Sequence, residues 1–124
     1  MIFQPIPSPT HTPWGAIQDA HQELPGIWWI STASHGGFIV SPERRAAMPA
    51  AMREFETFAG GNSYEEDGDW AIVVLAFAAE FTVEEIQKAV HTVAAAAAFE
   101  CVTQREQLKA IHDSYLTAGA AGAT

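Results

Sequence analysis

Two short segments of this sequence carry residue types that could do chemistry. The first, Ser31 to Gly37, spells S-T-A-S-H-G-G and combines hydroxyl groups, one imidazole and the flexible Gly36-Gly37 pair. Backbone N–H groups in such a turn could face a ligand, and Ser34 with His35 would be its reactive side chains. A nucleophile and its base usually come from distant parts of a chain, however, and Ser and Thr also serve hairpin turns through local hydrogen bonds. The segment is therefore either a ligand site or a structural turn, and the turn is the more typical use.

The second segment is acidic. Its four carboxylates fall within five positions and belong to Glu65, Glu66, Asp67 and Asp69. Such a cluster could bind a divalent cation, face a basic partner, or solvate the start of a helix. The loop lacks the alternating oxygen ligands and distal Glu of a calcium-binding EF-hand, so the metal interpretation is the weakest. We predict that these residues contact a partner, and we predict no metal site.

The other candidate ligands form no recognisable motif. The histidines show neither H-E-x-x-H nor a pairing with cysteine, so any metal centre would have to be assembled by the fold. His21 lies on an apolar stripe, which predicts a hydrogen-bonded core residue. Cys101 is the only cysteine and is expected to be a small core residue. A phosphate-binding glycine loop, a C-x-x-C motif and a basic stripe are all absent, so we predict no cofactor and no direct nucleic-acid binding.

Composition predicts one acidic, cytoplasmic domain. The chain has 124 residues and a net charge of -9, which suits a single core and disfavours contact with nucleic-acid phosphates. The lone cysteine is consistent with a reducing compartment. Four prolines interrupt the N-terminus, which therefore predicts an extended arm and no signal peptide. The longest apolar stretch, residues 70–79, is about half of what a membrane span of roughly 20 residues needs. We predict an arm over 1–11, a domain over 12–117 and a flexible tail over 118–124.

The first half of the chain predicts a short helix, a hairpin and two more helical pieces. Thr12-Pro13 is typical of a helix start, and apolar residues at helical spacing continue to Leu24. The aromatic and β-branched residues 27–32 and 38–40 flank the glycine pair and predict a β-hairpin. Ser41-Pro42 predicts another helix start, and Met48-Pro49 divides the following helical segment, which we expect to end near Gly60-Gly61.

The second half predicts helices. Ser63 with Glu66 has the spacing of a capping box, which favours a helix over residues 71–77, although the β-branched residues there would also suit a buried strand. Thr82 with Glu85 and Thr103 with Glu106 form two further boxes. The expected fold is α+β: a short β-hairpin packed against several helices, closing with a C-terminal helix pair.

The order of motifs resembles a family of small uncharacterised domains from proteobacteria and their plasmids and phages. The motifs are T-P-W-G, P-G-I, S-T-A-S-H-G-G, M-P and Y-E-E-D-x-D-W, and the resemblance covers roughly residues 10–82. The resemblance implies a mobile-element setting, where small acidic proteins often inhibit host defence, as anti-CRISPR proteins do. It implies no activity and assigns no role to any residue.

Charge and motifs together favour a non-enzymatic binding module. The acidic cluster would occupy a basic protein surface, for example on a nucleic-acid-handling defence complex of the host. The alternative is a small enzyme or ligand-binding domain centred on Ser34, His35 and the glycine turn, which requires His35 to face a pocket beside carboxylates. A third possibility is an accessory subunit that is stable only with its partner.

Overall fold

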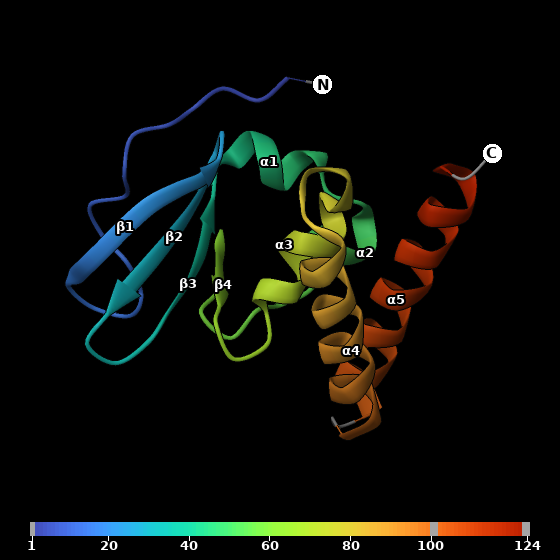
Figure 1. Ribbon diagram of the computed structural model, residues 1–124. Coiled ribbons are helices and arrows are strands. Elements are labelled where there is room, and N and C mark those ends of the chain that lie inside the picture. Colours follow the sequence, from blue (N-terminus) through green and yellow to red (C-terminus); the bar gives the residue numbers. More distant parts are fainter. Residues whose placement is uncertain (1, 100–101, 123–124) are drawn as a thin grey trace. The chain divides into compact units, whose positions relative to one another are not determined.

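The computed structural model describes residues 2–99 and 102–122 of the chain (Figure 1). Strands and helices follow one another in an α+β arrangement, which confirms the expected fold class. The elements group into two compact units. The first contains the described residues up to Met48 together with Glu56–Trp70, and the second contains Pro49–Phe55 together with the described residues from Ala71 onward. Cys101 lies outside the described residues, so its predicted core position has no structural counterpart here.

The first unit is built on an antiparallel sheet with the strand order β1-β2-β3-β4. The strands are β1 (Ile17–Leu24), β2 (Ile27–Thr32), β3 (Gly36–Val40) and β4 (Ser63–Glu65). Strands β2 and β3 form the predicted hairpin, in which Trp29 lies opposite Phe38 with the two rings edge to face at 4.9 Å. Ile27 and Ile30 are buried in β2, and the two tryptophans between them are half-buried. Because residues three apart in a strand point to opposite faces, both faces of β2 are at least partly covered.

The predicted helix after Thr12 is wrong, because this segment forms strand β1. The Thr12 hydroxyl accepts a hydrogen bond from the Trp14 amide at 3.2 Å and donates to the Gly15 carbonyl at 2.8 Å, which closes a turn. Pairing with β2 then begins at Ile17, and register shifts follow Ile17 and Gln22. These shifts break the two-residue alternation of a regular strand, so the apolar residues fall at spacings that resemble a helix.

His21 illustrates the consequence of that error. Its side chain is exposed on β1 and pairs with the carboxylate of Glu23, so the predicted core position is wrong. The half-buried neighbour Gln22 instead connects the strand to the arm, since its Oε1 accepts from the amides of Ile6 at 3.0 Å and Gly26 at 2.9 Å. The indole of Trp28 donates to the Ile6 carbonyl at 3.0 Å. Residues 2–11 form no helix or strand and are held by such contacts.

Two predicted helix signals after the hairpin are confirmed. Ser41 caps α1 (Pro42–Ala47) by accepting from the Arg44 amide at 3.1 Å, with Pro42 in the first turn. Met48-Pro49 ends α1 before α2 (Ala50–Arg53) begins. Helix α2 ends well before the glycine pair at 60–61, so its predicted end is wrong.

The predicted capping box at Ser63 is also wrong, and this difference shapes the candidate site. Ser63 to Glu65 form the edge strand β4, which pairs with β3 through the partners Phe38 and Tyr64. The helix expected over 71–77 is present as α3 (Trp70–Ala76) and starts only after the acidic loop. Long-range pairing with β3 therefore replaces the local cap that the sequence suggests.

The second unit contains the C-terminal helix pair. The short 3-10 helix η1 (Ala78–Glu80) precedes α4 (Val83–Phe99) and α5 (Val102–Gly122), which pack side by side in antiparallel directions (Figure 1). The capping box of Thr82 with Glu85 is confirmed, since the Glu85 amide donates to the Thr82 hydroxyl at 3.2 Å and Glu85 Oε1 accepts from the Thr82 amide. The side chain of Thr103 lies outside the described part, so the third box stays a prediction. None of the described helices has the length and apolarity to cross a membrane.

Candidate functional site

The β2–β3 turn holds His35 in a fixed backbone position. The Thr32 amide donates to the His35 carbonyl at 2.9 Å, and the His35 amide donates back to the Thr32 hydroxyl at 3.1 Å. Ser34 points elsewhere, because its hydroxyl donates to the Trp14 carbonyl at 3.2 Å. The turn is therefore satisfied by local Ser and Thr hydrogen bonds, and Ser34 is engaged with backbone rather than with the imidazole.

Strand β4 brings Glu65 to that imidazole. Gly37 lies opposite Glu65 in the β3–β4 ladder, and the Glu66 amide donates to the Gly36 carbonyl at 2.8 Å. The approach is so close that a Cβ on Gly37 would lie 2.2 Å from the Tyr64 carbonyl oxygen. The glycine pair therefore makes this register possible, because any side chain at Gly37 would collide with β4.

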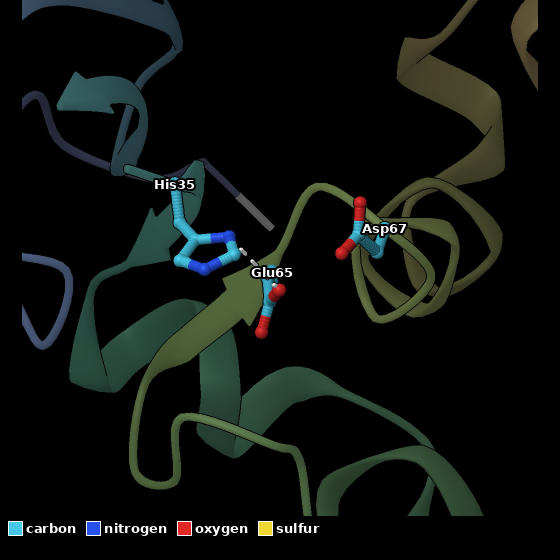
Figure 2. Close-up of side chains that lie close together, drawn as sticks. All are labelled: His35, Glu65 and Asp67. Carbon is cyan, nitrogen blue, oxygen red and sulfur yellow. Dashed lines mark ion pairs between the residues drawn. The ribbon is translucent and has the colours of Figure 1, made fainter. Parts of the chain in front are cut away.

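His35, Glu65 and Asp67 form one cluster of potential metal-ligating groups. His35 Nδ1 lies 3.5 Å from Glu65 Oε1, and one ligand atom from each of the three residues lies within 4.8 Å of the others. Figure 2 shows His35 and Glu65 facing each other, with Asp67 on the loop after β4. The Glu65 side chain is only 7% exposed, whereas that of His35 is 47% exposed. The cluster thus combines a buried carboxylate, Glu65, with an accessible imidazole, His35.

An open cavity of about 330 Å³ lies over this cluster and is lined by His35, Phe58, Glu65, Asp67, Gly68 and Asp69. Three of the lining residues carry carboxylates, and none is Lys or Arg. Phe58 is 83% exposed, and its amide donates to Asp69 Oδ2 at 2.8 Å. The cavity therefore combines excess negative charge with an exposed aromatic ring.

Comparison with known proteins places the chain in a family. Residues 7–119 match the model of the domain of unknown function DUF7007. The chain belongs to the DUF7007 family. This confirms the expected membership of an uncharacterised domain family. No curated protein and no solved structure matches this DUF7007 chain.

The DUF7007 fold separates the acidic residues that the sequence presents as one cluster. Glu65, Asp67 and Asp69 line the cavity with His35, whereas Glu66 is exposed and lies outside the cavity lining. The sequence presented His35 and the carboxylates as separate candidates, and the ligand-binding alternative required His35 to face a pocket beside carboxylates. The structure places His35 in such a cavity. Phe58 was missed altogether, because an aromatic residue in a loop gives no sequence signal that distinguishes it from a core residue.

Burial raises the pKa of the Glu65 carboxyl in this DUF7007 chain; nearby His35 opposes the rise, and the carboxyl groups of Asp67 and Asp69 add to it. The folded chain therefore binds this proton more tightly than the unfolded chain. The stability that this tighter proton binding contributes is fully present at pH values below the ordinary glutamate pKa. It is lost as the pH rises through the raised pKa of Glu65.

The Glu65→Gln variant tests how far ionisation of Glu65 destabilises the folded chain in the absence of added cations. Because glutamine does not ionise, we expect the variant to gain stability relative to the wild type as the pH rises from acidic to neutral. Urea unfolding at a series of pH values measures the difference, and Glu66→Gln is the matched exposed control. A difference between Glu65→Gln and the wild type that is independent of pH would show that Glu65 ionises as freely as in the unfolded chain.

Proposed function

We propose that this DUF7007 chain is a binding domain whose ligand places a positively charged group in the cavity beside His35, Glu65 and Asp67. One observation carries the proposal: the buried Glu65 carboxylate shares the cavity with Asp67 and Asp69, and no Lys or Arg side chain lines it. Buried charges in proteins are normally paired or bind metals. A cationic ligand would neutralise the carboxylates of Glu65 and Asp67.

Binding is better supported than nucleophilic catalysis. The Ser34 hydroxyl donates to the Trp14 carbonyl, and no hydrogen bond links it to His35 among the described residues. A serine nucleophile needs its base within hydrogen-bond reach. The side chains that do converge on the cavity are an imidazole and carboxylates, which are groups that bind cations.

A panel of cations tests the proposal by thermal unfolding at constant ionic strength. The panel contains divalent metal chlorides, methylguanidinium and ethylammonium, with sodium as reference. A ligand present at about 100 times its Kd stabilises the folded state by about 2.7 kcal/mol, which raises Tm by roughly 10 °C in a domain of this size. We expect at least one cation to do so in the wild type and not in Glu65→Gln. Glu84→Gln, on the exposed face of α4, should respond like the wild type. The proposal fails if no cation stabilises the wild type more than sodium.

A second candidate is favoured by the exposure of Glu66 and Asp67 beside the cavity. These carboxylates would contact a basic protein surface, in keeping with the net charge of -9. An inhibitor of a nucleic-acid-handling defence complex, in a mobile-element or anti-CRISPR-like setting, would be the specific form of this candidate. Pull-down from bacterial lysate with wild type and Glu66→Lys at low and high salt tests it: a partner that is lost on charge reversal and at high salt would support it.

A further inference from the structure

We infer that the cation in this cavity is a divalent transition-metal ion such as Zn²⁺ or Mn²⁺, held by a ring nitrogen of His35 and by carboxylate oxygens of Glu65 and Asp67. The inference rests on the proposed function and names its ligand class. These three residues are the cluster whose ligand atoms lie within 4.8 Å of one another.

The donor set selects the class of metal. Imidazole nitrogen is a good ligand for Zn²⁺ and other transition metals, whereas Ca²⁺ and Mg²⁺ are held by oxygen atoms. A neutral imidazole with two carboxylates carries two negative charges, which one divalent ion neutralises. One nitrogen and two oxygen donors therefore favour a transition metal over calcium.

The spacing of the donors also fits such an ion. Ligand atoms about 2.1 Å from a tetrahedral zinc ion lie about 3.4 Å from one another. His35 Nδ1 and Glu65 Oε1 are 3.5 Å apart, so these two atoms already have the separation that one metal ion requires. Asp67 is the exposed carboxylate of the cluster, and its ligand atom lies within 4.8 Å of the other two.

Glu65 is the buried donor of the cluster. Its carboxylate is more than nine-tenths buried and faces the cluster, and its only ion pair within the described part of the chain is with His35. The strand register at Gly37 holds Glu65 in place, and the hydrogen bonds with Thr32 fix the backbone of His35. The backbone positions of two of the three donor residues are therefore fixed before any metal binds.

Three protein ligands leave at least one coordination position for water or for a further ligand. The cavity provides room for such a group, and the exposed ring of Phe58 lies at its edge. An apolar or aromatic group attached to the coordinating atom would contact that ring. Phe58 is thus the residue best placed to select what joins the metal.

Isothermal titration calorimetry of the chelator-treated full chain tests the inference with ZnCl₂, MnCl₂ and CaCl₂ in separate titrations. We expect one equivalent of Zn²⁺ or Mn²⁺ to bind more tightly than Ca²⁺. His35→Ala and Asp67→Asn should each weaken that binding by more than about tenfold. The matched controls are Glu66→Gln, which changes the neighbouring exposed carboxylate, and His21→Ala, which removes the exposed histidine beside Glu23. Both should bind like the wild type.

Three results would overturn the inference: binding that His35→Ala and Asp67→Asn leave unchanged, a preference for Ca²⁺, or no metal binding at all. Circular dichroism establishes whether each variant folds. If His35→Ala does not fold, Asp67→Asn still tests the inference, because Asp67 is exposed and its substitution leaves the core unchanged. If metals fail to bind but methylguanidinium stabilises the wild type, the metal inference fails while the proposed function stands. If no cation of either kind binds, both fail.

Discussion

Gly37→Ala is expected to destabilise the chain by more than about 3 kcal/mol and to abolish cation binding with it. A Cβ at this position would lie 2.2 Å from the Tyr64 carbonyl oxygen and 2.9 Å from the Glu65 Cα. Both atoms belong to the backbone of β4, so no side-chain rotation can relieve the collision. The strand must move away from β3, and Glu65 would then leave His35. The effect on the site follows directly from the effect on the sheet.

Urea unfolding and the metal titration measure the two parts of this prediction. Gly68→Ala is the matched control, because it lies in the same cavity wall and a Cβ there meets no atom within 4 Å. We expect that variant to stay within about 0.5 kcal/mol of the wild type, as for a surface substitution. A Gly37→Ala protein that unfolds with wild-type stability would show that β3 and β4 do not approach as closely as described.

Arg44→Ala is expected to cost about 3–5 kcal/mol, because it removes a buried hydrogen bond from a charged group together with the packing of a large buried side chain. Arg44 is 0% exposed, its Nε donates to the Pro25 carbonyl at 2.9 Å, and its guanidinium lies 3.9 Å from the centroid of the Phe3 ring. Truncation leaves the carbonyl without this donor, opens a cavity beside α1 and removes the partner of the arm. The prediction therefore includes faster proteolysis within residues 2–11.

Chemical denaturation and limited proteolysis check this second prediction. Arg105→Ala, on the exposed surface of α5, is the control for loss of an arginine and should leave both measurements close to wild type. Arg44→Lys keeps the charge but lacks the planar guanidinium, so its stability should fall between the alanine variant and the wild type. Equal stability of Arg44→Ala and Arg105→Ala would contradict the structural role of Arg44.

Local signals predicted part of the fold correctly. Ser41 before Pro42, and Thr82 before Glu85, satisfy helix ends through side chains only three residues apart, so neighbouring sequence contains the whole interaction. Ser63 with Glu66 has the same spacing but lies where β4 pairs with β3. That competing partner is distant in sequence, and no local rule could detect it.

The helix predicted after Thr12 was wrong for a different reason, and this segment forms strand β1. Its two register shifts place apolar residues at irregular intervals, and the preceding Thr12-Pro13 matches a helix start. The Thr12 hydroxyl closes a turn instead. A pattern method that assumes one constant period cannot represent a strand with such irregularities.

The candidate site was predictable in its parts but not in its assembly. His35 and the acidic residues were each identified from residue type, while their meeting depends on the pairing of Gly37 with Glu65. Once β4 is known, its pairing with β3 explains why Glu65 is buried, whereas Glu66 follows the end of the strand and is exposed. The glycine pair was the available signal, because a strand without side chains allows another backbone to approach closely.

The most direct test of the cation site is two-dimensional ¹⁵N–¹H NMR of the full chain during titration with Mn²⁺, whose unpaired electrons broaden nearby amide signals. We expect early, selective loss of the amide signals of His35, Gly36 and residues 65–68, with those of His21 and Glu23 retained. The same titration of Asp67→Asn should require more Mn²⁺ for equal broadening. Uniform broadening, or selective broadening centred on His21 and Glu23, would contradict a cation site at His35, Glu65 and Asp67.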